Sequence, residues 1–193
     1  MDSYEVLPEG YEQSISLDLQ KDKKLFLLVT GLGVLIGVVM VLLGCFHLPV
    51  LMMMVGSFWQ VEFRLLAVGL CMVVYIVLHE AVHGVFMWKY SGKKPSFGFT
   101  LAYAYAGSEV YFAKHPYLVI ALAPVVIWGL VLGVACALAP ETWFWPIYFI
   151  QIANLSGAAG DLYVLWRFSR LPADILVQDT GVSMTVFTKK GVL

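Results

Sequence analysis

Four long runs of apolar residues, separated by polar segments, dominate the chain. They cover residues 25–46, 65–88, 117–139 and 143–168. Each run has about 20 residues or more, the length that an α-helix needs to cross the hydrocarbon core of a bilayer. The pattern therefore predicts about four transmembrane helices, the third of them broken by Pro124. Residues 48–59 are also apolar but too few to span, so we expect an interfacial or re-entrant segment there.

The polar segments between and around these runs carry strand patterns. Residues 14–20 alternate polar and apolar side chains, which favours a short strand. Residues 89–115 are rich in Tyr, Phe and Gly and predict a β-hairpin or small sheet against the membrane, and residues 175–187 predict two short strands around a turn at 179–181. The expected fold is mainly α: a membrane protein of about four transmembrane helices, with a small cytoplasmic β element and a short C-terminal β-hairpin.

The same pattern divides the chain into three parts. Residues 1–24 form a polar N-terminal segment, residues 25–168 a membrane domain that includes the β-rich loop 89–115, and residues 169–193 a C-terminal tail. The basic residues gather in alternate polar segments of the chain. Lys21, Lys23 and Lys24 precede the first run, Lys89, Lys93, Lys94 and Lys114 separate the second from the third, and Arg167, Arg170, Lys189 and Lys190 follow the fourth. By the positive-inside rule, the chain is a multi-pass cell-membrane protein with both termini and loop 89–115 in the cytoplasm.

Composition supports a membrane protein throughout. Hydrophobic residues make up 61% of the chain, charged residues 13%, and the mean hydropathy is +0.84. A soluble domain is about a quarter charged. The net charge of −1 and the lack of a basic stripe argue against nucleic acid as a partner, so the lipid bilayer is the expected surroundings. The three Cys all lie in apolar runs and indicate small buried hydrophobes without a disulfide framework.

The second apolar run contains the motif His79-Glu80-Ala81-Val82-His83. Two His four residues apart project from one face of a helix, at the spacing that lets both hold one metal ion. Glu80, beside the first His, is placed to take a proton from water at that ion. Such side chains are costly in lipid, so their presence within a span favours a functional site. The motif predicts a zinc hydrolase within the membrane, although iron or cobalt would also suit these ligands.

The predicted third zinc ligand is Asp161. It is the only other acidic residue within any of the four runs, and it lies at about the same predicted depth as His83. The small residues 156–160 precede it and would let neighbouring helices approach closely enough for short metal bonds. Glu109, in the cytoplasmic loop, is a weaker alternative, since loop residues also supply ligands.

Asn154 lies two turns before Asp161, on the same face of the predicted fourth helix. It is a candidate hydrogen-bond donor to the substrate backbone or the oxyanion. An interhelical polar contact explains an Asn at this position equally well.

These residues carry a resemblance to two families. His79–His83 with Asn154 and Asp161 resembles the site-2 protease class of intramembrane zinc metalloproteases, although Gly160 and Leu162 flank Asp161 where that class has a different pattern. The layout along most of the chain, including residues 7–11, 18–24 and the Asp-Thr-Gly of the tail, is similar to a family of small four-span zincin peptidases. The resemblance implies the fold and the zinc chemistry, with Glu80 as catalytic base and His79, His83 and Asp161 as ligands.

The expected function is therefore hydrolysis of peptide bonds in membrane-associated or transmembrane substrates, near the cytoplasmic leaflet. The strands of residues 97–111 could hold an unwound substrate extended by edge pairing. Two alternatives stay open: a metal-binding transporter or sensor subunit without proteolysis, and a structural partner in which the His and Asp only form hydrogen bonds. The physiological substrate and the oligomeric state have no signature in the sequence.

Overall fold

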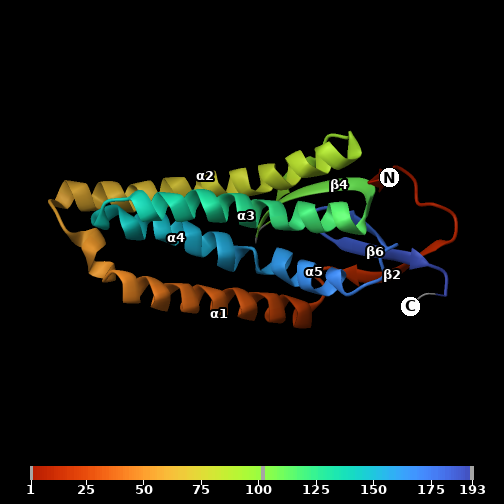
Figure 1. The fold of residues 1–193 in the computed structure, drawn as a ribbon, viewed down its shortest axis with the longest axis horizontal. Helices are drawn as coiled ribbons and strands as arrows, with labels where there is room; N and C mark the ends of the chain where they lie inside the picture. Colours follow the sequence, from red (N-terminus) through yellow and green to blue (C-terminus); the bar gives the residue numbers. More distant parts are fainter. Residues whose placement is uncertain (1, 101–102, 192–193) are drawn as a thin grey trace. The chain divides into compact units, whose positions relative to one another are not determined.

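The computed structural model describes residues 2–100 and 103–191 of the chain (Figure 1). These residues form two compact units. The sheet unit comprises Met1–Val29, Glu80–Pro124 and Gly160–Leu193, and the helical unit comprises Thr30–His79 and Val125–Ala159. Residues 101 and 102 of the predicted β-rich loop, and residues 1, 192 and 193 of the predicted terminal segments, lie outside the described residues.

Among the described residues, three helices are long and apolar enough to cross a membrane. They are α1 (Lys23–His47), α2 (Phe58–Ser91) and α3 (Lys114–Leu138). Only 6% of the most apolar window of α1 and 11% of that of α2 are buried by the rest of the protein. Side chains such as Leu35, Leu66 and Leu130 are therefore exposed, as a lipid environment would require. The first three predicted spans are confirmed as long apolar helices.

The fourth predicted span is not one helix. Residues 143–168 are divided between α4 (Glu141–Gly157) and α5 (Ala159–Ser169), with the break at Ala158 (Figure 1). Glycine destabilises a helix interior by about 1 kcal/mol relative to Ala, and Gly157 and Gly160 flank this break. The argument that placed Asn154 and Asp161 on one face of one helix was therefore wrong, because the two residues lie on different helices.

One further local prediction differs from the structure. The expected break at Pro124 is absent, since α3 continues through this residue. Proline is tolerated in membrane helices where neighbouring groups satisfy the backbone that it frees. The segment 48–59 contains a short 3-10 helix, η1 (Val50–Met54), held by the buried Arg64 of α2, whose Nη1 donates to the carbonyls of Met53 (2.8 Å) and Val55 (2.7 Å).

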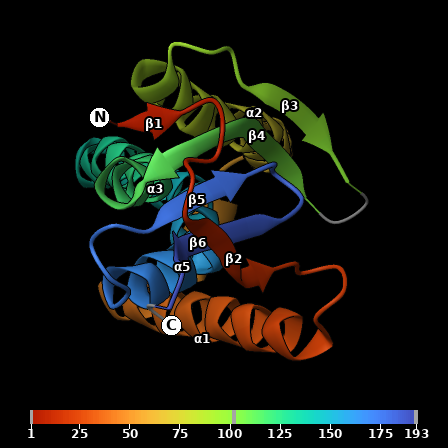
Figure 2. The ribbon, with the colours of Figure 1, turned by 90° about the vertical axis from the view of Figure 1, so that its right-hand side faces the viewer.

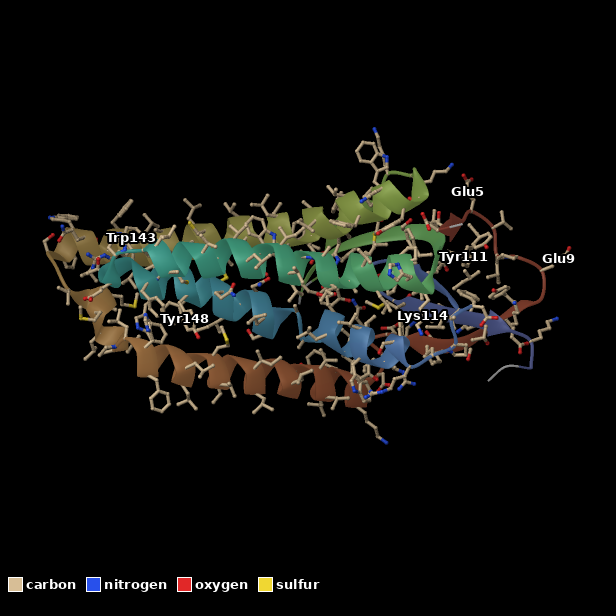
Figure 3. The ribbon with its side chains drawn as sticks, viewed as in Figure 1. Glu5, Glu9, Tyr111, Lys114, Trp143 and Tyr148 are labelled. Carbon is tan, nitrogen blue, oxygen red and sulfur yellow. The ribbon has the colours of Figure 1, made fainter. Side chains whose placement is uncertain are left out.

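In the helical unit, α1 and α4 pack in close contact. A Cβ at Gly33 would lie 2.8 Å from the carbonyl oxygen of Ser156, so only glycine fits there. Further along, the Tyr148 hydroxyl donates to the Met40 carbonyl at 2.8 Å (Figure 3). The indole of Trp145, fully buried, donates to the carbonyl of Leu48 at 2.9 Å. These contacts join α4 to α1 and to the loop that follows it.

The sheet unit contains one six-stranded antiparallel sheet (Figure 2). Its strands are β1 (Ser3–Tyr4), β2 (Tyr11–Leu17), β3 (Ser96–Phe99), β4 (Ala104–Ala113), β5 (Leu176–Asp179) and β6 (Met184–Lys189). The order is β1-β4-β5-β6-β2, and β3 pairs with the first half of β4. The predicted hairpins in residues 89–115 and 175–187 are both present. The two elements belong to one sheet, because β4 pairs with β5.

The N-terminal segment also joins this sheet. The strand expected at residues 14–20 is β2, displaced toward the N-terminus, and it pairs with β6. Strand β1 had no counterpart in the sequence analysis. One core joins the sheet to the ends of α2, α3 and α5 through Met87, Phe112, Ile120, Phe168 and Val177. This packing places the start of α3 and the first half of β4 beside the C-terminal half of α2.

Candidate metal centre

Helix α2 presents the His-Glu-His group of the motif. The ligand atoms of His79, Glu80 and His83 all lie within 4.8 Å of one another. Both His residues are buried, with 8% and 9% of their surface exposed. Helical periodicity places residues i and i+4 one turn apart on one face, so this part of the arrangement follows directly from the sequence. The predicted juxtaposition of these three side chains is confirmed.

His83 has its ring orientation set by α3. Its Nδ1 lies 3.0 Å from the carbonyl oxygen of Ile120, which can only accept, so Nδ1 carries the proton and Nε2 is left for a metal ion. Nε2 lies 3.6 Å from Oδ1 of Asp161. Two ligand atoms about 2.0–2.1 Å from one tetrahedral zinc ion are roughly 3.4 Å apart. The His83–Asp161 pair therefore has a separation that suits shared ligation of zinc.

Asp161 stands in the first turn of α5. The positive end of the helix dipole stabilises a carboxylate at this position, independently of any metal. The break between α4 and α5 thus supplies a local reason for Asp161 in addition to ligation. Its place beside His83 supports the prediction that it is the third zinc ligand, and that assignment stays a prediction.

His79 is oriented by polar contacts within the helical unit. The Tyr75 hydroxyl lies 2.8 Å from His79 Nδ1 and donates to Oδ1 of Asn154 at 2.9 Å. Nδ2 of Asn154 in turn donates to the carbonyl of Val125 at 3.2 Å, which fixes the orientation of the amide. A hydroxyl has one proton, and here it goes to Asn154, so Tyr75 accepts from His79 Nδ1–H. Nε2 of His79, like that of His83, is then the nitrogen available to a metal.

Asn154 is fully buried in this arrangement. Its amide oxygen and nitrogen contact Tyr75 and Val125, both in the helical unit. These contacts favour the interhelical reading of Asn154 and connect it to the metal centre through His79. Its role as a substrate-binding residue stays a prediction.

Glu80 is held by the sheet. The backbone N–H of Ala106, in the first half of β4, donates to Oε2 of Glu80 at 2.9 Å. Charge-assisted hydrogen bonds of this kind are roughly twice as strong as those between neutral groups. The contact aligns the carboxylate of the predicted base with the strand that runs beside α2.

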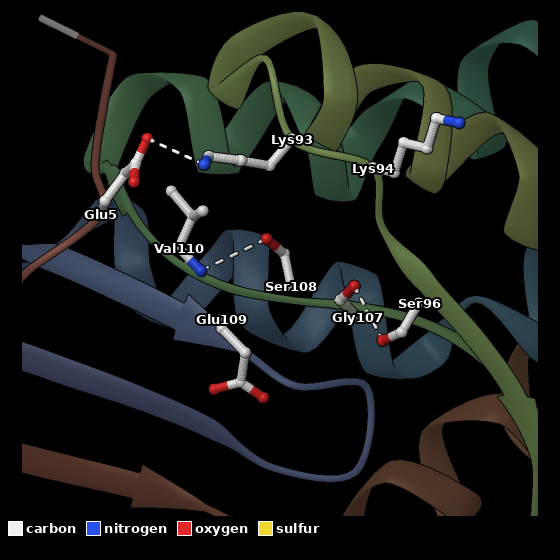
Figure 4. Close-up of a pocket in the computed structure, with 8 residues that line it drawn as sticks. All are labelled: Glu5, Lys93, Lys94, Ser96, Gly107, Ser108, Glu109 and Val110. Atoms are coloured by element: carbon white, nitrogen blue, oxygen red, sulfur yellow. Dashed lines mark hydrogen bonds and ion pairs between the residues drawn. The ribbon is translucent and has the colours of Figure 1, made fainter.

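Glu109 lies elsewhere on β4. It is exposed and lines a surface pocket with Glu5, Lys93, Lys94, Ser96, Gly107, Ser108 and Val110 (Figure 4). Lys93 in this pocket pairs with Glu5 at 3.2 Å. The His-Glu-His group includes neither Glu109 nor Asp161, but Oδ1 of Asp161 lies 3.6 Å from Nε2 of His83. Of the two carboxylates proposed as third ligand, Asp161 is therefore the one that the structure brings next to a motif His.

Sequence reasoning missed three groups that orient the motif residues: the Tyr75 hydroxyl, the Ile120 carbonyl and the Ala106 N–H. Tyr75 had a signal, because it precedes His79 by four residues and so lies on the same helix face. The two backbone groups had none, since every residue carries them and only tertiary packing decides which ones meet a side chain.

Comparisons with known proteins agree with this geometry. A family model described as "Putative zincin peptidase" matches residues 72–176, more than half of the chain. The matched segment contains α2 from Met72 onward, with its His-Glu-His group, and Asp161. An "uncharacterized 24.7 kDa protein in gap 5'region" of Pyrococcus woesei is 29% identical over 118 residues, which cover 58% of this chain. The match spans about half, 51%, of that relative. No solved structure matches the chain significantly.

Proposed function

The chain belongs to the zincin peptidase family, and we therefore propose that it is an intramembrane zinc metalloprotease. Its substrates are membrane-associated or transmembrane proteins or peptides, cut near the cytoplasmic leaflet. The proposal includes a site like that of the site-2 protease class. It also includes an orientation with both termini in the cytoplasm, which the distribution of Lys and Arg supports.

The observation that carries the proposal is the place of the His-Glu-His group. His79, Glu80 and His83 are held together on α2, a helix apolar enough to cross a membrane. Both His residues use Nδ1 in a hydrogen bond, which leaves Nε2 of each ring as the nitrogen available to a metal ion. Metal-binding His residues commonly have such a partner, which fixes the tautomer and the ring orientation. The donor set therefore fits zinc.

In the proposed mechanism, His79, His83 and Asp161 would hold the zinc ion. A zinc ion bound there would supply a Lewis acid for the scissile carbonyl and would lower the pKa of a water molecule toward about 7. Glu80 accepts the proton of that water on its carboxylate and later delivers it to the leaving amine. The N–H of Ala106 keeps the carboxylate aligned for both transfers.

Strand β4 suggests how a substrate is presented. A transmembrane helix must unwind before one of its carbonyls becomes accessible, and an extended segment can be held by pairing with a strand edge. β4 reaches Glu80 through Ala106, so a segment aligned along this strand would pass close to the base. Asn154 is the proposed hydrogen-bond donor to the substrate through the second N–H of its amide, since the first donates to Val125.

The decisive experiment replaces Glu80 with Gln in the full-length protein in detergent or vesicles. Gln keeps the size of the side chain and can still accept from Ala106, but it is not a base. We expect zinc content to stay at the wild-type level and cleavage of a helical membrane peptide to fall by about 10²–10⁴-fold, the usual effect of losing a general base.

The result also separates the proposal from its alternative. A variant that binds zinc and cleaves at the wild-type rate would exclude Glu80 as the base. Wild-type protein that binds zinc stoichiometrically and cleaves no membrane peptide would favour a metal-binding transporter or sensor subunit.

A further inference from the structure

The turn between β5 and β6, Asp179–Gly181, contains a buried carboxylate outside the segment that the family model matches. Asp179 is 7% exposed. Its Oδ2 accepts from the hydroxyl of Tyr117 at 2.6 Å, and its Oδ1 from the N–H of Gly181 at 2.9 Å. Burial raises the pKa of Asp179, and these two hydrogen bonds oppose that rise. A carboxylate is costly to bury, so its two partners define where this turn must lie.

The first partner leads to His83. Tyr117 is 1% exposed and stands in the first turn of α3. Ile120 follows three residues later, on the next turn of the same helix, and its carbonyl accepts from His83. The hydrogen bond between Asp179 and Tyr117 therefore anchors the part of α3 that orients a predicted zinc ligand.

The same turn also reaches the strand that holds Glu80. Gly107 of β4 lies against the turn so closely that a Cβ there would overlap the carbonyl group of Thr180 and lie 2.8 Å from the nitrogen of Gly181. Gly181 itself has φ +81°, a backbone conformation that favours glycine. Ala106, the neighbour of Gly107, donates to Glu80. The turn thus packs one residue away from the group that aligns the base.

We propose that the Asp179–Gly181 turn is a positioning element of the metal centre, which holds the start of α3 for His83 and the first half of β4 for Glu80. The inference rests on the proposed function, in which these two residues are ligand and base. All of its contacts lie within the sheet unit. The alternative is a hairpin turn that stabilises the sheet and has no effect on zinc binding.

The first test uses Tyr117→Phe, which removes one hydroxyl and keeps the ring, with Tyr111→Phe as the matched control. Tyr111, labelled in Figure 3, lies on β4 in the same unit. Its ring packs on Phe187. Zinc affinity is measured by competition with a chromophoric chelator, and the ligand geometry by the visible absorption bands of the cobalt-substituted protein. Loss of an outer partner of a metal ligand typically weakens metal binding about 10–100-fold. Tyr117 acts on His83 only through Ile120, so we expect an effect no larger than the lower end of this range, about 10-fold weaker zinc binding, with altered cobalt bands, and neither change for Tyr111→Phe.

The second test compares two substitutions of Asp179. Asn at this position can still contact both partners, by accepting from Gly181 and donating to Tyr117, whereas Ala can contact neither. We expect Asp179→Asn to keep zinc affinity within about threefold of wild type and Asp179→Ala to match Tyr117→Phe, because outer-partner losses act through the same His83. The double variant Tyr117→Phe/Asp179→Ala should bind zinc no more weakly than Asp179→Ala alone, since Asp179→Ala already removes the bond to Tyr117.

The third test separates the strand contact from the helix contact. A Cβ at Gly107 forces β4 and Thr180 apart; because Asp179 stays bonded to Tyr117 and Gly181, the displacement falls on β4 and Ala106 shifts relative to Glu80, which is not a zinc ligand. We expect kcat to fall about 10-fold with KM and zinc affinity near wild type. Gly133→Ala, on α3 where a Cβ meets open space, is the control and should change neither constant.

Wild-type zinc affinity and cobalt bands in Tyr117→Phe would overturn the inference, even if Asp179→Ala failed to fold. Equal losses in Tyr111→Phe would also overturn it, because the effect would then be general to the unit. Both readouts are independent of cleavage. If the wild-type protein binds zinc and cleaves nothing, the proposed function fails while the link from the turn to His83 is still tested.

Discussion

Replacing Tyr75 with Phe removes one oxygen atom from the buried contact behind His79. The hydroxyl lies 2.8 Å from His79 Nδ1 and 2.9 Å from Asn154 Oδ1, and Tyr75 is 7% exposed. Because this hydroxyl accepts the Nδ1 proton, it holds the tautomer and the ring plane in which Nε2 can bind zinc. The substitution keeps the proposed zinc ligands and removes only the hydrogen bonds of Tyr75 with His79 and Asn154.

The size of the effect follows from the two hydrogen bonds. The Tyr75–Asn154 bond joins α2 to α4, and polar contacts between membrane helices contribute about 0.6 kcal/mol on average and up to about 1.7 kcal/mol. With the same range taken for the Tyr75–His79 bond within α2, the two bonds correspond to roughly 1–3 kcal/mol. Each 1.4 kcal/mol is a tenfold change in a dissociation constant, which gives about 10-fold to 100-fold weaker zinc binding. In other proteins, removing a hydrogen-bond partner of a metal ligand weakens metal binding by about the same factor. We expect the lower end, because only one of the two bonds reaches a ligand directly.

The assay is zinc competition on the full-length protein in detergent, with thermal unfolding of the metal-free protein measured in parallel. Tyr148→Phe is the matched control, since it removes a hydroxyl that donates to the Met40 carbonyl at 2.8 Å, also in the helical unit, without reaching a His. Two results would refute the reasoning: zinc affinity unchanged in Tyr75→Phe, or an equal loss in Tyr148→Phe.

Two further predictions concern the ligand set and the topology. Purified protein should carry about one zinc per chain, and Asp161→Ala should lower this content sharply while Glu109→Ala leaves it unchanged; full zinc content in Asp161→Ala, measured by atomic absorption, would exclude Asp161 as a ligand. Single Cys residues introduced at Lys93 and Glu141 into a variant without the native Cys should be labelled from the cytoplasmic and the outer side, respectively; labelling of position 93 from outside would invert the proposed orientation.

Parts of this protein were predictable because they depend on neighbours in the sequence. The spacing of His79, Glu80 and His83 is set by helical periodicity, and three of the four apolar runs are single helices because a long apolar segment satisfies its backbone hydrogen bonds within a helix. The two hairpins likewise follow from turn residues between strand-forming segments.

The fourth run shows where local reasoning failed. Its apolar content predicted one helix, but the small residues around Ala158 allow a break, and the break places Asp161 in the first turn of a new helix. The predicted face shared by Asn154 and Asp161 does not exist. Asp161 nevertheless lies 3.6 Å from His83, because the packing of α5 in the sheet unit decides its position.

The sequence by itself determined the chemistry: which side chains can bind zinc, which can act as a base, and that they stand on an apolar helix. Only the tertiary structure decided how those side chains are held. Ala106 meets Glu80 across 26 positions of the chain, and Asp179 meets Tyr117 across 62. The first contact uses a backbone N–H, a group that nearly every residue carries, and the second joins two side chains that only sheet and helix packing bring together, so no local pattern in the sequence specifies either contact.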